Sequence, residues 1–311
     1  MDYLNTARND DHLQFDVMVV GEALIDVVTK VDSIVEHPGG SPANVAYGLG
    51  RLGVSTALLT AIGPDSRGDS IESHLHEAGV TLLPGARSLA RTASASAVIE
   101  ADGSASYVFD IAWDPAPSVP TYVPKILHTG SIATFLSPGA GVVRSLIEQA
   151  HDDCMVTYDP NIRPALLGSH SEAKAIFEDL VPLTDVVKLS DEDAKWLYPQ
   201  KSLDDTAAHI LGLGTGLTVI TRGGDGSQFS TRATSISIPA VKCTVADTIG
   251  AGDSYMSALI FGFLSRGIDG FTPAVLEKLG HTAAAAAAIT VQRPGANPPT
   301  LAELNNLFDM A

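Results

Sequence analysis

The sequence predicts an α/β fold, a three-layer α/β/α sandwich with a mostly parallel central sheet and a small β lid beside it. Short apolar runs typical of strands alternate along the chain with longer amphipathic runs typical of helices. This alternation indicates a parallel sheet with helices on both faces. One stretch instead alternates residue by residue around Asp102-Gly103, which indicates a hairpin outside the main sheet. The length of 311 residues is enough for one large domain of this kind.

The expected strands of the main sheet are the apolar runs 16–20, 57–62, 126–129, 155–158, 185–188 and 217–221. The expected helices are the runs 42–52, 66–78, 141–150, 171–180, 204–211, 252–264 and 273–290. In sheets of this kind, ligands bind beyond the carboxyl ends of the strands.

Two segments depart from the alternation and are expected to form the lid. Residues 92–100 and 104–109 flank the hairpin turn, and 27–35 is a second β-like piece. We therefore expect a lid built from about 27–37 and 91–113, inserted in a single domain that spans 1–311.

Composition and charge exclude several classes of protein. The net charge of −17, with no run of Lys and Arg to reverse it, argues against binding to nucleic acid or to an anionic membrane. Cys154 and Cys243 lie far apart and suggest neither a disulfide framework nor a zinc site, so a reducing cytoplasm is the expected compartment. The polar, acidic segment 1–16 does not resemble a signal peptide, and no apolar run is suited to crossing a bilayer.

A run of small residues leads into the expected helix that starts near residue 252. Gly250 and Gly252 allow backbone conformations closed to other residues, and successive amides at a helix start form an anion site. Asp253 is then either a helix cap or a general base. As a base it would take a proton from a hydroxyl, while the turn Gly250-Ala251-Gly252 stabilises charge on phosphoryl oxygens. The glycines favour the base, because a carboxylate that faces an anion hole is a poor cap.

A second glycine-rich turn precedes the helix expected at 42–52. Ser41 is the expected N-cap and Pro42 suits the first helical position. Gly39 and Gly40 let a ligand approach the backbone closely, and Asn44 offers both a donor and an acceptor. Neutral groups of this kind suit a polyol better than a phosphate, although a simple capping turn explains the segment equally well.

Together these two segments resemble the paired signatures of the ribokinase-like sugar kinases, the phosphofructokinase-B-type family. The first resembles Gly-Gly-x-x-x-Asn before a helix that ends near Arg51-Leu52-Gly53, and the second matches Asp-Thr-x-Gly-Ala-Gly-Asp. Further matches cover most of the chain from Asp16 to about Pro299: Gly21-Glu22-x-Leu24-Ile25-Asp26, Ile62-Gly63-x-Asp65, Asp159-x-Asn161-x-Arg163 and Thr221-x-Gly223-x-x-Gly226. The resemblance implies an ATP-dependent kinase that phosphorylates a sugar hydroxyl.

The resemblance also implies roles for the matching positions. The sugar would be bound by Asp26, Gly39, Gly40 and Asn44, with Arg91 at the entry to the lid. Arg163 would face the phosphate or the substrate, the alternative being a surface ion pair. ATP would contact Ser190, Thr221, Gly223, Gly226 and Thr248. A monovalent cation, K⁺, would be bound by Asp247, the Ile249 carbonyl and the region of Gly295. Mg²⁺ would arrive with ATP, held largely through phosphates and water. Many members pair through their lids, so a homodimer is expected.

Two departures bear on these expectations. Where the family often has Asn-x-x-Glu near a Mg²⁺-bound water, this chain has Ser190 and Asp193, so Asp193 becomes the candidate for that water. The segments 21–26 and 159–164 resemble those of fructokinases more than those of ribokinases, but Asp110 stands where fructokinases often place an arginine. We expect fructose as the substrate; ribose, 2-keto-3-deoxygluconate and a nucleoside remain alternatives.

Other classes of function fit the sequence less well. The chain has no Gly-Lys dipeptide and so no classical P-loop, and it has no Gly-x-Ser-x-Gly nucleophile elbow. A sugar-binding or regulatory protein without turnover remains a second hypothesis, because of the altered Ser190 and Asp193. The presence of Asp253 and its glycines argues for the enzyme.

Overall fold

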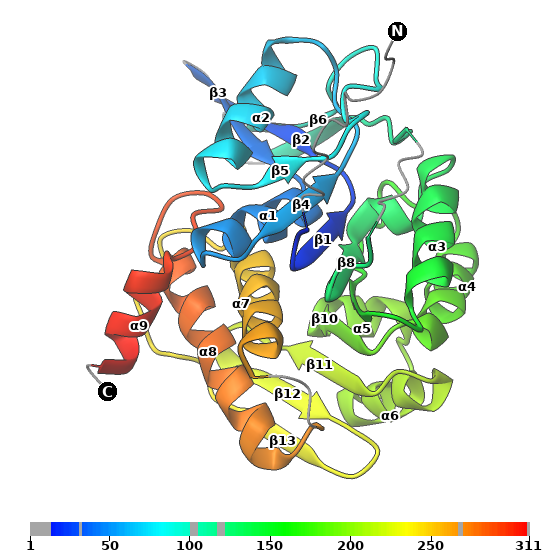
Figure 1. Cartoon of the computed structure of the whole chain (residues 1–311), viewed down its shortest axis with the longest axis vertical. Coiled ribbons are helices and arrows are strands. Elements are labelled where there is room, and N and C mark those ends of the chain that lie inside the picture. Colours follow the sequence, from blue (N-terminus) through cyan, green and yellow to red (C-terminus); the bar gives the residue numbers. More distant parts are fainter. Residues whose placement is uncertain (1–13, 31–32, 100–104, 117–121, 267–269, 310–311) are drawn as a thin grey trace, which may run out of the picture.

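The computed structural model describes residues 14–30, 33–99, 105–116, 122–266 and 270–309 (Figure 1). Its main sheet has nine strands in the order β13-β12-β11-β10-β9-β8-β1-β4-β5. The bounds, in that spatial order, are Ser235–Ile238, Ser227–Ser230, Leu217–Thr221, Val186–Ser190, Met155–Asp159, Ile126–Gly130, Val17–Val20, Thr56–Leu59 and Thr81–Leu82. Every pairing from β11 to β5 is parallel, and only β12 and β13 run antiparallel. The mostly parallel sheet predicted from the sequence is confirmed.

The strands are buried on both faces because successive residues point to opposite sides. In β1, Val17 and Val19 join one apolar cluster, while Met18 and Val20 join the other. Helices α1 (Ser41–Arg51), α2 (Ser66–Glu77), α7 (Ala251–Arg266), α8 (Pro273–Val291) and α9 (Leu301–Asp309) contribute to the first cluster. Helices α3 (Gly139–Ala150), α4 (His170–Leu180), α5 (Asp191–Leu197) and α6 (Leu203–Leu213) contribute to the second. The chain is therefore a three-layer α/β/α sandwich (Figure 1).

The alanine-rich part of α8 has a packing role, as its composition suggests. Ala283, Ala285 and Ala286 are buried in the same cluster as Met256, Leu259 and Ile260 of α7. Small side chains let two helices approach closely, since neither presents bulk at the contact. The helix begins where the Thr272 side chain accepts a hydrogen bond from the Val275 amide, a regular N-cap.

Four elements were not expected from the sequence: β5, the hairpin β12–β13, α5 and α9. Helix α5 directly follows β10, and its start is a capping box in which Ser190 and Asp193 bond each other's backbone amides. The hairpin consists of two four-residue strands rich in serine. Such short segments carry too little periodicity to be recognised.

The lid is a second sheet of four strands in the order β3-β2-β6-β7. These are Ser33–Gly39, Leu24–Lys30, Ser94–Ile99 and Ala105–Asp110. The segment 27–35, expected as a single β piece, contributes residues to two strands, β2 and β3, that pair antiparallel to each other. The central pair β2 and β6 is parallel, which joins the two lid segments. The expected hairpin turn at Asp102-Gly103 lies outside the described residues.

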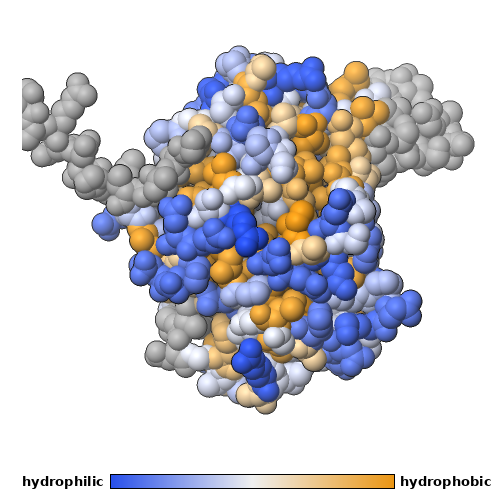
Figure 2. Space-filling model, turned by 90° about the vertical axis from the view of Figure 1, so that its right-hand side faces the viewer, coloured by the Kyte–Doolittle hydropathy of each residue, from blue (hydrophilic) through white to orange (hydrophobic). Residues whose placement is uncertain are grey.

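No helix in the described part of the chain is both long and apolar enough to span a lipid bilayer. The face drawn in Figure 2 has hydrophilic side chains interspersed with apolar ones. The apolar side chains gather in the upper half, the end of the molecule at which the lid strands lie in Figure 1.

Candidate active site

The candidate site lies where the starts of α1 and α7 meet beside the lid. Asp253 is the third residue of α7 and is half-buried. Its carboxylate accepts two hydrogen bonds from α1: Ser41 Oγ donates to Oδ1 at 2.6 Å, and Asn44 Nδ2 donates to Oδ2 at 2.9 Å. Hydrogen bonds to an ionised acceptor are the strong ones, so the orientation of this carboxylate is held from both sides.

The expected N-cap role of Ser41 is wrong. Gly40 occupies the N-cap position with φ of 97°, no side chain caps the helix, and Ser41 is the first residue of α1. The serine hydroxyl instead donates to Asp253, and the charge on this acceptor makes the hydrogen bond a strong one. A side chain at position 40 would approach the Glu22 carbonyl oxygen to 2.6 Å, so glycine is required there by both φ and space.

The turn before α7 has the shape expected for an anion site. Gly250 has φ of 75°, and a Cβ there would lie 2.6 Å from Ala296 Cβ. The amides of Gly252 and Asp253 belong to the first turn of α7, where amides have no acceptor within the helix. They are therefore free to bind an anion, which the helix dipole favours at this end.

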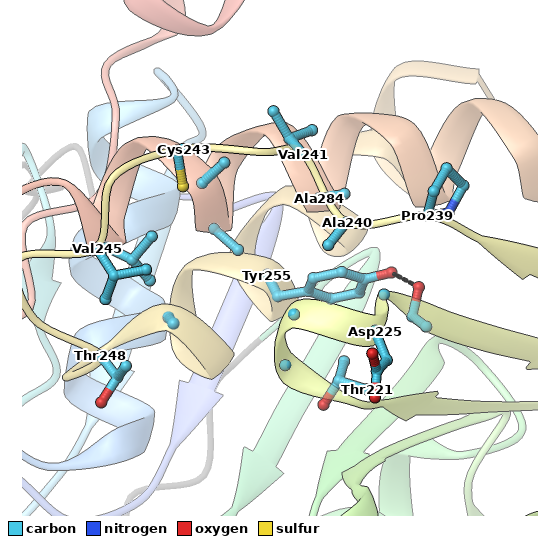
Figure 3. Close-up of a pocket in the computed structure, with 18 of the residues that line it drawn as sticks. Thr221, Asp225, Pro239, Ala240, Val241, Cys243, Val245, Thr248, Tyr255 and Ala284 are labelled. Carbon is cyan, nitrogen blue, oxygen red and sulfur yellow. Dashed lines mark hydrogen bonds between the residues drawn. The ribbon is translucent and has the colours of Figure 1, made fainter.

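A cavity of about 550 Å³ opens beside this turn (Figure 3). The structure brings together in its wall the predicted nucleotide contacts Thr221, Gly223, Gly226 and Thr248 and the anion-hole residues Ala251 and Gly252. Among the predicted nucleotide contacts, Ser190 is the one that does not line it. Tyr255 lies across the cavity floor, and its hydroxyl bonds Ser227 Oγ at 2.7 Å.

The apolar wall of this cavity was not predicted. It is formed by residues of α8 and of the segment that follows β13: Val241, Val245, Ala284, Ala287, Ala288 and Val291. The alanine run in α8 was the one sequence feature that could have indicated this apolar wall, but helix packing also explains the run. A mostly apolar slot that ends at helix-start amides suits a flat heterocycle attached to phosphates.

Asp26 carries the second carboxylate of the site. It lies on β2, in register with His37 of β3 and Ala95 of β6. Burial, with repulsion from Asp253 added, raises the pKa of Asp26 to about 6, although Arg163 and His37 oppose the shift. A Cβ at Gly39 would overlap the Asp26 carboxylate, so the glycine makes room for it. Asp26 is thus close enough to Asp253 for the two charges to interact, and Asn44 bonds the same Asp253 carboxylate.

The two predicted arginines occupy different situations. Arg163 is exposed and donates to the Ile162 carbonyl at 3.0 Å. Arg91 forms an ion pair with Asp110 at 2.8 Å, and its side chain is 74% exposed. The positive charge of Arg91 is therefore paired with the carboxylate of Asp110, the last residue of β7.

The predicted cation loops are in contact. Asp247 Oδ1 accepts from the Ile249 amide at 3.0 Å, and Oδ2 accepts from the Gly295 amide at 2.8 Å. Each Asp247 oxygen keeps a further lone pair beyond these bonds, so the carboxylate can still offer an oxygen ligand to a monovalent cation. In the described residues no three His, Cys, Asp or Glu side chains converge as a metal site.

Asp193 has a structural task that the sequence did not indicate. Its Oδ1 accepts from the Ile162 amide at 2.9 Å and its Oδ2 from the Ser190 amide at 3.0 Å. The side chain is buried. These bonds connect the start of α5 to the loop after β9. A role for Asp193 in ordering a metal-bound water stays a prediction.

Glu22, after β1, is a buried carboxyl that the sequence analysis did not single out. Its Oε2 accepts from the Ala133 amide at 3.2 Å. Burial raises the pKa of Glu22 from its ordinary 4.5 to about 8, against the opposing hydrogen bonds from Ser131 and Ala133 and with a smaller contribution from Asp253. At neutral pH this side chain is protonated and adds no charge to the site.

We expect Glu22 to make the protein less stable as the pH rises. Between pH 4.5 and about 8 the folded chain keeps a proton on Glu22 that the unfolded chain has lost. The free energy of unfolding then falls by up to about 1.4 kcal/mol per pH unit through this group. Glu22→Gln should remove that part of the dependence, which urea unfolding at pH 5.5 and 7.5 measures. Glu148→Gln, on the exposed side of α3, is the control; an unchanged pH dependence in Glu22→Gln would contradict the assignment.

Comparison with known proteins agrees with this geometry. The family model described as pfkB family carbohydrate kinase matches residues 14–303. The fructokinase of Rhizobium leguminosarum bv. trifolii is 31% identical over 256 residues, which is 78% of each chain. The crystal structure of fructokinase with bound ATP from Xylella fastidiosa has a TM-score of 0.81 and 23% identity, covering 94% of this chain and 98% of that one.

A third similar protein is aminoimidazole riboside kinase from Salmonella enterica, solved with aminoimidazole riboside and an ATP analog. Its TM-score is 0.79 at 25% identity, with coverage of 93% of this chain and 98% of that one. The family match spans nearly the whole described chain, and the fold agrees with it. The chain therefore belongs to the pfkB family of carbohydrate kinases and is an ATP-dependent sugar kinase of the fructokinase-like type.

Proposed function

We propose that the protein transfers the γ-phosphoryl group of ATP to a hydroxyl of a neutral sugar, with fructose as the first candidate. The observation that carries this proposal is the position of Asp253. Its carboxylate is held by Ser41 and Asn44 at the sugar side, one residue from the Gly252 that lines the nucleotide cavity.

The reaction follows from that placement. Asp253 takes the proton of the sugar hydroxyl as its oxygen forms a bond to the γ-phosphorus. The bond between that phosphorus and the β–γ bridging oxygen breaks, and ADP leaves with the electron pair. The amides at the start of α7 stabilise the charge on the transferring phosphoryl oxygens. Asp26 and Asn44 orient the sugar hydroxyls.

We infer a neutral sugar from the charges on the lid. Arg91 pairs with Asp110 at 2.8 Å, and Arg67 of α2 bonds the lid residue Glu36 at 3.2 Å. Each arginine is thus neutralised by a carboxylate, and a phosphate or carboxylate on the sugar would have to displace one of them. This arrangement disfavours 2-keto-3-deoxygluconate and leaves fructose, ribose and a nucleoside.

The experiment that tests the function is an ADP-release assay with ATP, Mg²⁺ and a panel of fructose, ribose, glucose, 2-keto-3-deoxygluconate and adenosine. We expect fructose to give the highest kcat/KM. Saturable sugar binding without release of ADP from any acceptor would instead identify a binding or regulatory protein. Such a protein would be the second hypothesis that the altered Ser190 and Asp193 keep open.

Asn44→Ala should raise the KM for the sugar more than the KM for ATP. The amide loses a sugar contact and releases one side of Asp253, and hydrogen bonds to charged groups are worth about 1.5–3 kcal/mol. We expect kcat/KM for the sugar to fall by about 10- to 100-fold. Asn305→Ala, on the exposed side of α9, is the control. A larger effect on the KM for ATP would reassign the turn at Gly39 and Gly40 to the nucleotide.

Two ions enter this proposal differently. Mg²⁺ would be held largely by the phosphates of ATP and by water, and Asp193 stays the predicted residue for ordering a metal-bound water. A K⁺ ion would be bound at the loops that the hydrogen bond between Asp247 and Gly295 joins. We expect K⁺ to raise kcat more than Na⁺ at matched ionic strength and to raise the unfolding temperature. Equal responses to the two ions would argue against the cation loop.

We further propose that the lid pairs two copies of the chain. Ile34 of β3 is 69% exposed and Val108 of β7 is 60% exposed, and both lie on edge strands of the lid sheet. Edge strands with exposed apolar residues are suited to association. Light scattering should give the mass of a dimer, and Ile34→Lys with Val108→Lys should give a monomer; a monomeric unsubstituted chain would refute the pairing.

The free Cys154 and Cys243 fit a reducing cytoplasm as the site of action.

A further inference from the structure

A buried ion pair lies beneath the start of α7. Lys188 Nζ donates to Asp159 Oδ2 at 2.6 Å, and the two side chains are only 5% and 2% exposed. Lys188 is on β10 and Asp159 ends β9, two neighbouring parallel strands. Both residues therefore reach the carboxyl edge of the sheet, where ligands bind in this class of fold.

The pair is incompletely satisfied, which a purely structural pair should not be. Asp159 Oδ1 is buried and has no hydrogen-bond partner. The ammonium of Lys188 has three donors, and the one hydrogen bond described for it is that to Asp159. Taking two charges out of water is costly and is repaid only when their remaining groups are also bonded.

The Lys188 ammonium lies next to the predicted anion hole, at Gly252. A Cβ built on Gly252 would lie 3.1 Å from Lys188 Nζ, and Gly252 lines the nucleotide cavity. Burial by itself lowers the pKa of Lys188, but Asp159, with Asp253 and Asp193 adding, raises it above its ordinary value. The ammonium is therefore charged at neutral pH. Among the described residues it is also the one Lys or Arg that is buried.

We propose that Lys188 is a further catalytic residue, whose ammonium binds an oxygen of the transferring phosphoryl group through the space left open at Gly252. This rests on the proposed function. Lys188 keeps its protons throughout, since the sugar proton goes to Asp253 and the leaving electron pair goes to ADP. It supplies positive charge near the carboxylate of Asp253, which would otherwise repel the phosphate. Asp159 is the positioning residue that holds the ammonium in place.

The test separates this role from a structural one with a double variant. Lys188→Met alone leaves Asp159 buried and unpaired, so it is expected to lower the unfolding temperature. Lys188→Met with Asp159→Asn removes both charges and should recover most of that loss. We expect kcat of the double variant to stay at least about 100-fold below that of the unsubstituted enzyme, the range known for loss of one charge-stabilising donor. Recovery of kcat to within about fivefold would show that Lys188 only neutralises Asp159 and would overturn the proposal.

Nucleotide binding gives a second readout that does not depend on turnover. Affinities for ADP and for a non-hydrolysable ATP analogue are measured by calorimetry. Loss of Lys188 should weaken the binding of the analogue by about tenfold or more. The affinity for ADP should change by less than threefold, because only the analogue carries the third phosphate. An equal change for both ligands would also overturn the proposal. Lys188→Gln, which keeps a donor toward Asp159, serves in both measurements if the double variant does not fold.

The matched control is an exposed pair with the same chemistry. Lys195 Nζ and Asp191 Oδ2 are 2.6 Å apart on α5, and the lysine side chain is 65% exposed. Lys195→Met with Asp191→Asn should leave kcat and the ADP-to-analogue preference unchanged. If the unsubstituted chain releases no ADP with any sugar, the proposed function fails, and the calorimetric comparison still decides whether Lys188 binds the third phosphate.

Discussion

Asp253→Asn is expected to lower kcat by a factor of about 10² to 10⁴ while the fold is kept. Asparagine has the same shape, so the packing at the start of α7 is unchanged. It has no basic oxygen to receive the sugar proton, and its amide group would face the donors of Ser41 or Asn44, which now bond the two carboxylate oxygens. The measurement is ADP release at saturating sugar and ATP, together with thermal unfolding.

The control for this variant is Asp152→Asn, whose side chain is 90% exposed. It removes the same charge far from the site and should leave kcat unchanged. ATP binding by Asp253→Asn should stay within a few fold, because the carboxylate does not take part in holding the nucleotide. Turnover near that of the unsubstituted enzyme would remove Asp253 from the mechanism, whereas loss of folding would show the carboxylate to be structural.

Gly252→Val is expected to have the second largest effect. It should lower kcat by at least about 100-fold and weaken the binding of ATP. The position is helical and does not have positive φ, so valine is tolerated by the backbone. Its Cβ would lie 3.1 Å from Lys188 Nζ and its methyl groups would extend into the cavity that Gly252 lines. They would occupy the place of the phosphoryl group and screen the amides from it, and removal of one such donor costs 10²–10³ in kcat.

Gly141→Val is the matched control for this effect. Gly141 is also in a helix, α3, and a Cβ there meets nothing within 4 Å. Both variants place a β-branched residue in a helix, so any change in helix stability from intrinsic propensity should be similar in the two. Steady-state kinetics and ATP binding should therefore change only in Gly252→Val. Unchanged ATP kinetics in Gly252→Val would contradict the anion hole, and equal losses in both variants would point to helix stability.

Much of the fold could be predicted from the sequence, because its signals are local. The six expected strands of the main sheet are all present, with ends displaced by at most three residues. The run at 57–62 continues past the strand, which ends at Leu59, since apolar residues also line the loop that follows. The hairpin β12–β13 and the helices α5 and α9 were missed because four-residue strands and helices of seven to nine residues have little periodicity.

The site could be predicted in part, for a related reason. The Gly250-to-Asp253 turn is contiguous, so its residue types alone indicate an anion hole next to a base. Ser41 was assigned to a cap because capping is its usual local role. Its actual partner, Asp253, is 212 positions away in the chain, and no local pattern reports such a contact.

The sequence by itself determined the layered α/β architecture, the glycine turn before α7 and the family of sugar kinases to which the chain belongs. Each of these follows from residue types that are close together in the chain. Tertiary structure alone decided that Ser41 and Asn44 hold the Asp253 carboxylate, that α8 contributes to the apolar wall of the cavity, and that Lys188 lies next to Gly252. The physical reason is that hydrogen bonds, burial and charge depend on distances between side chains, and those distances are set only when the sheet and its helices are packed.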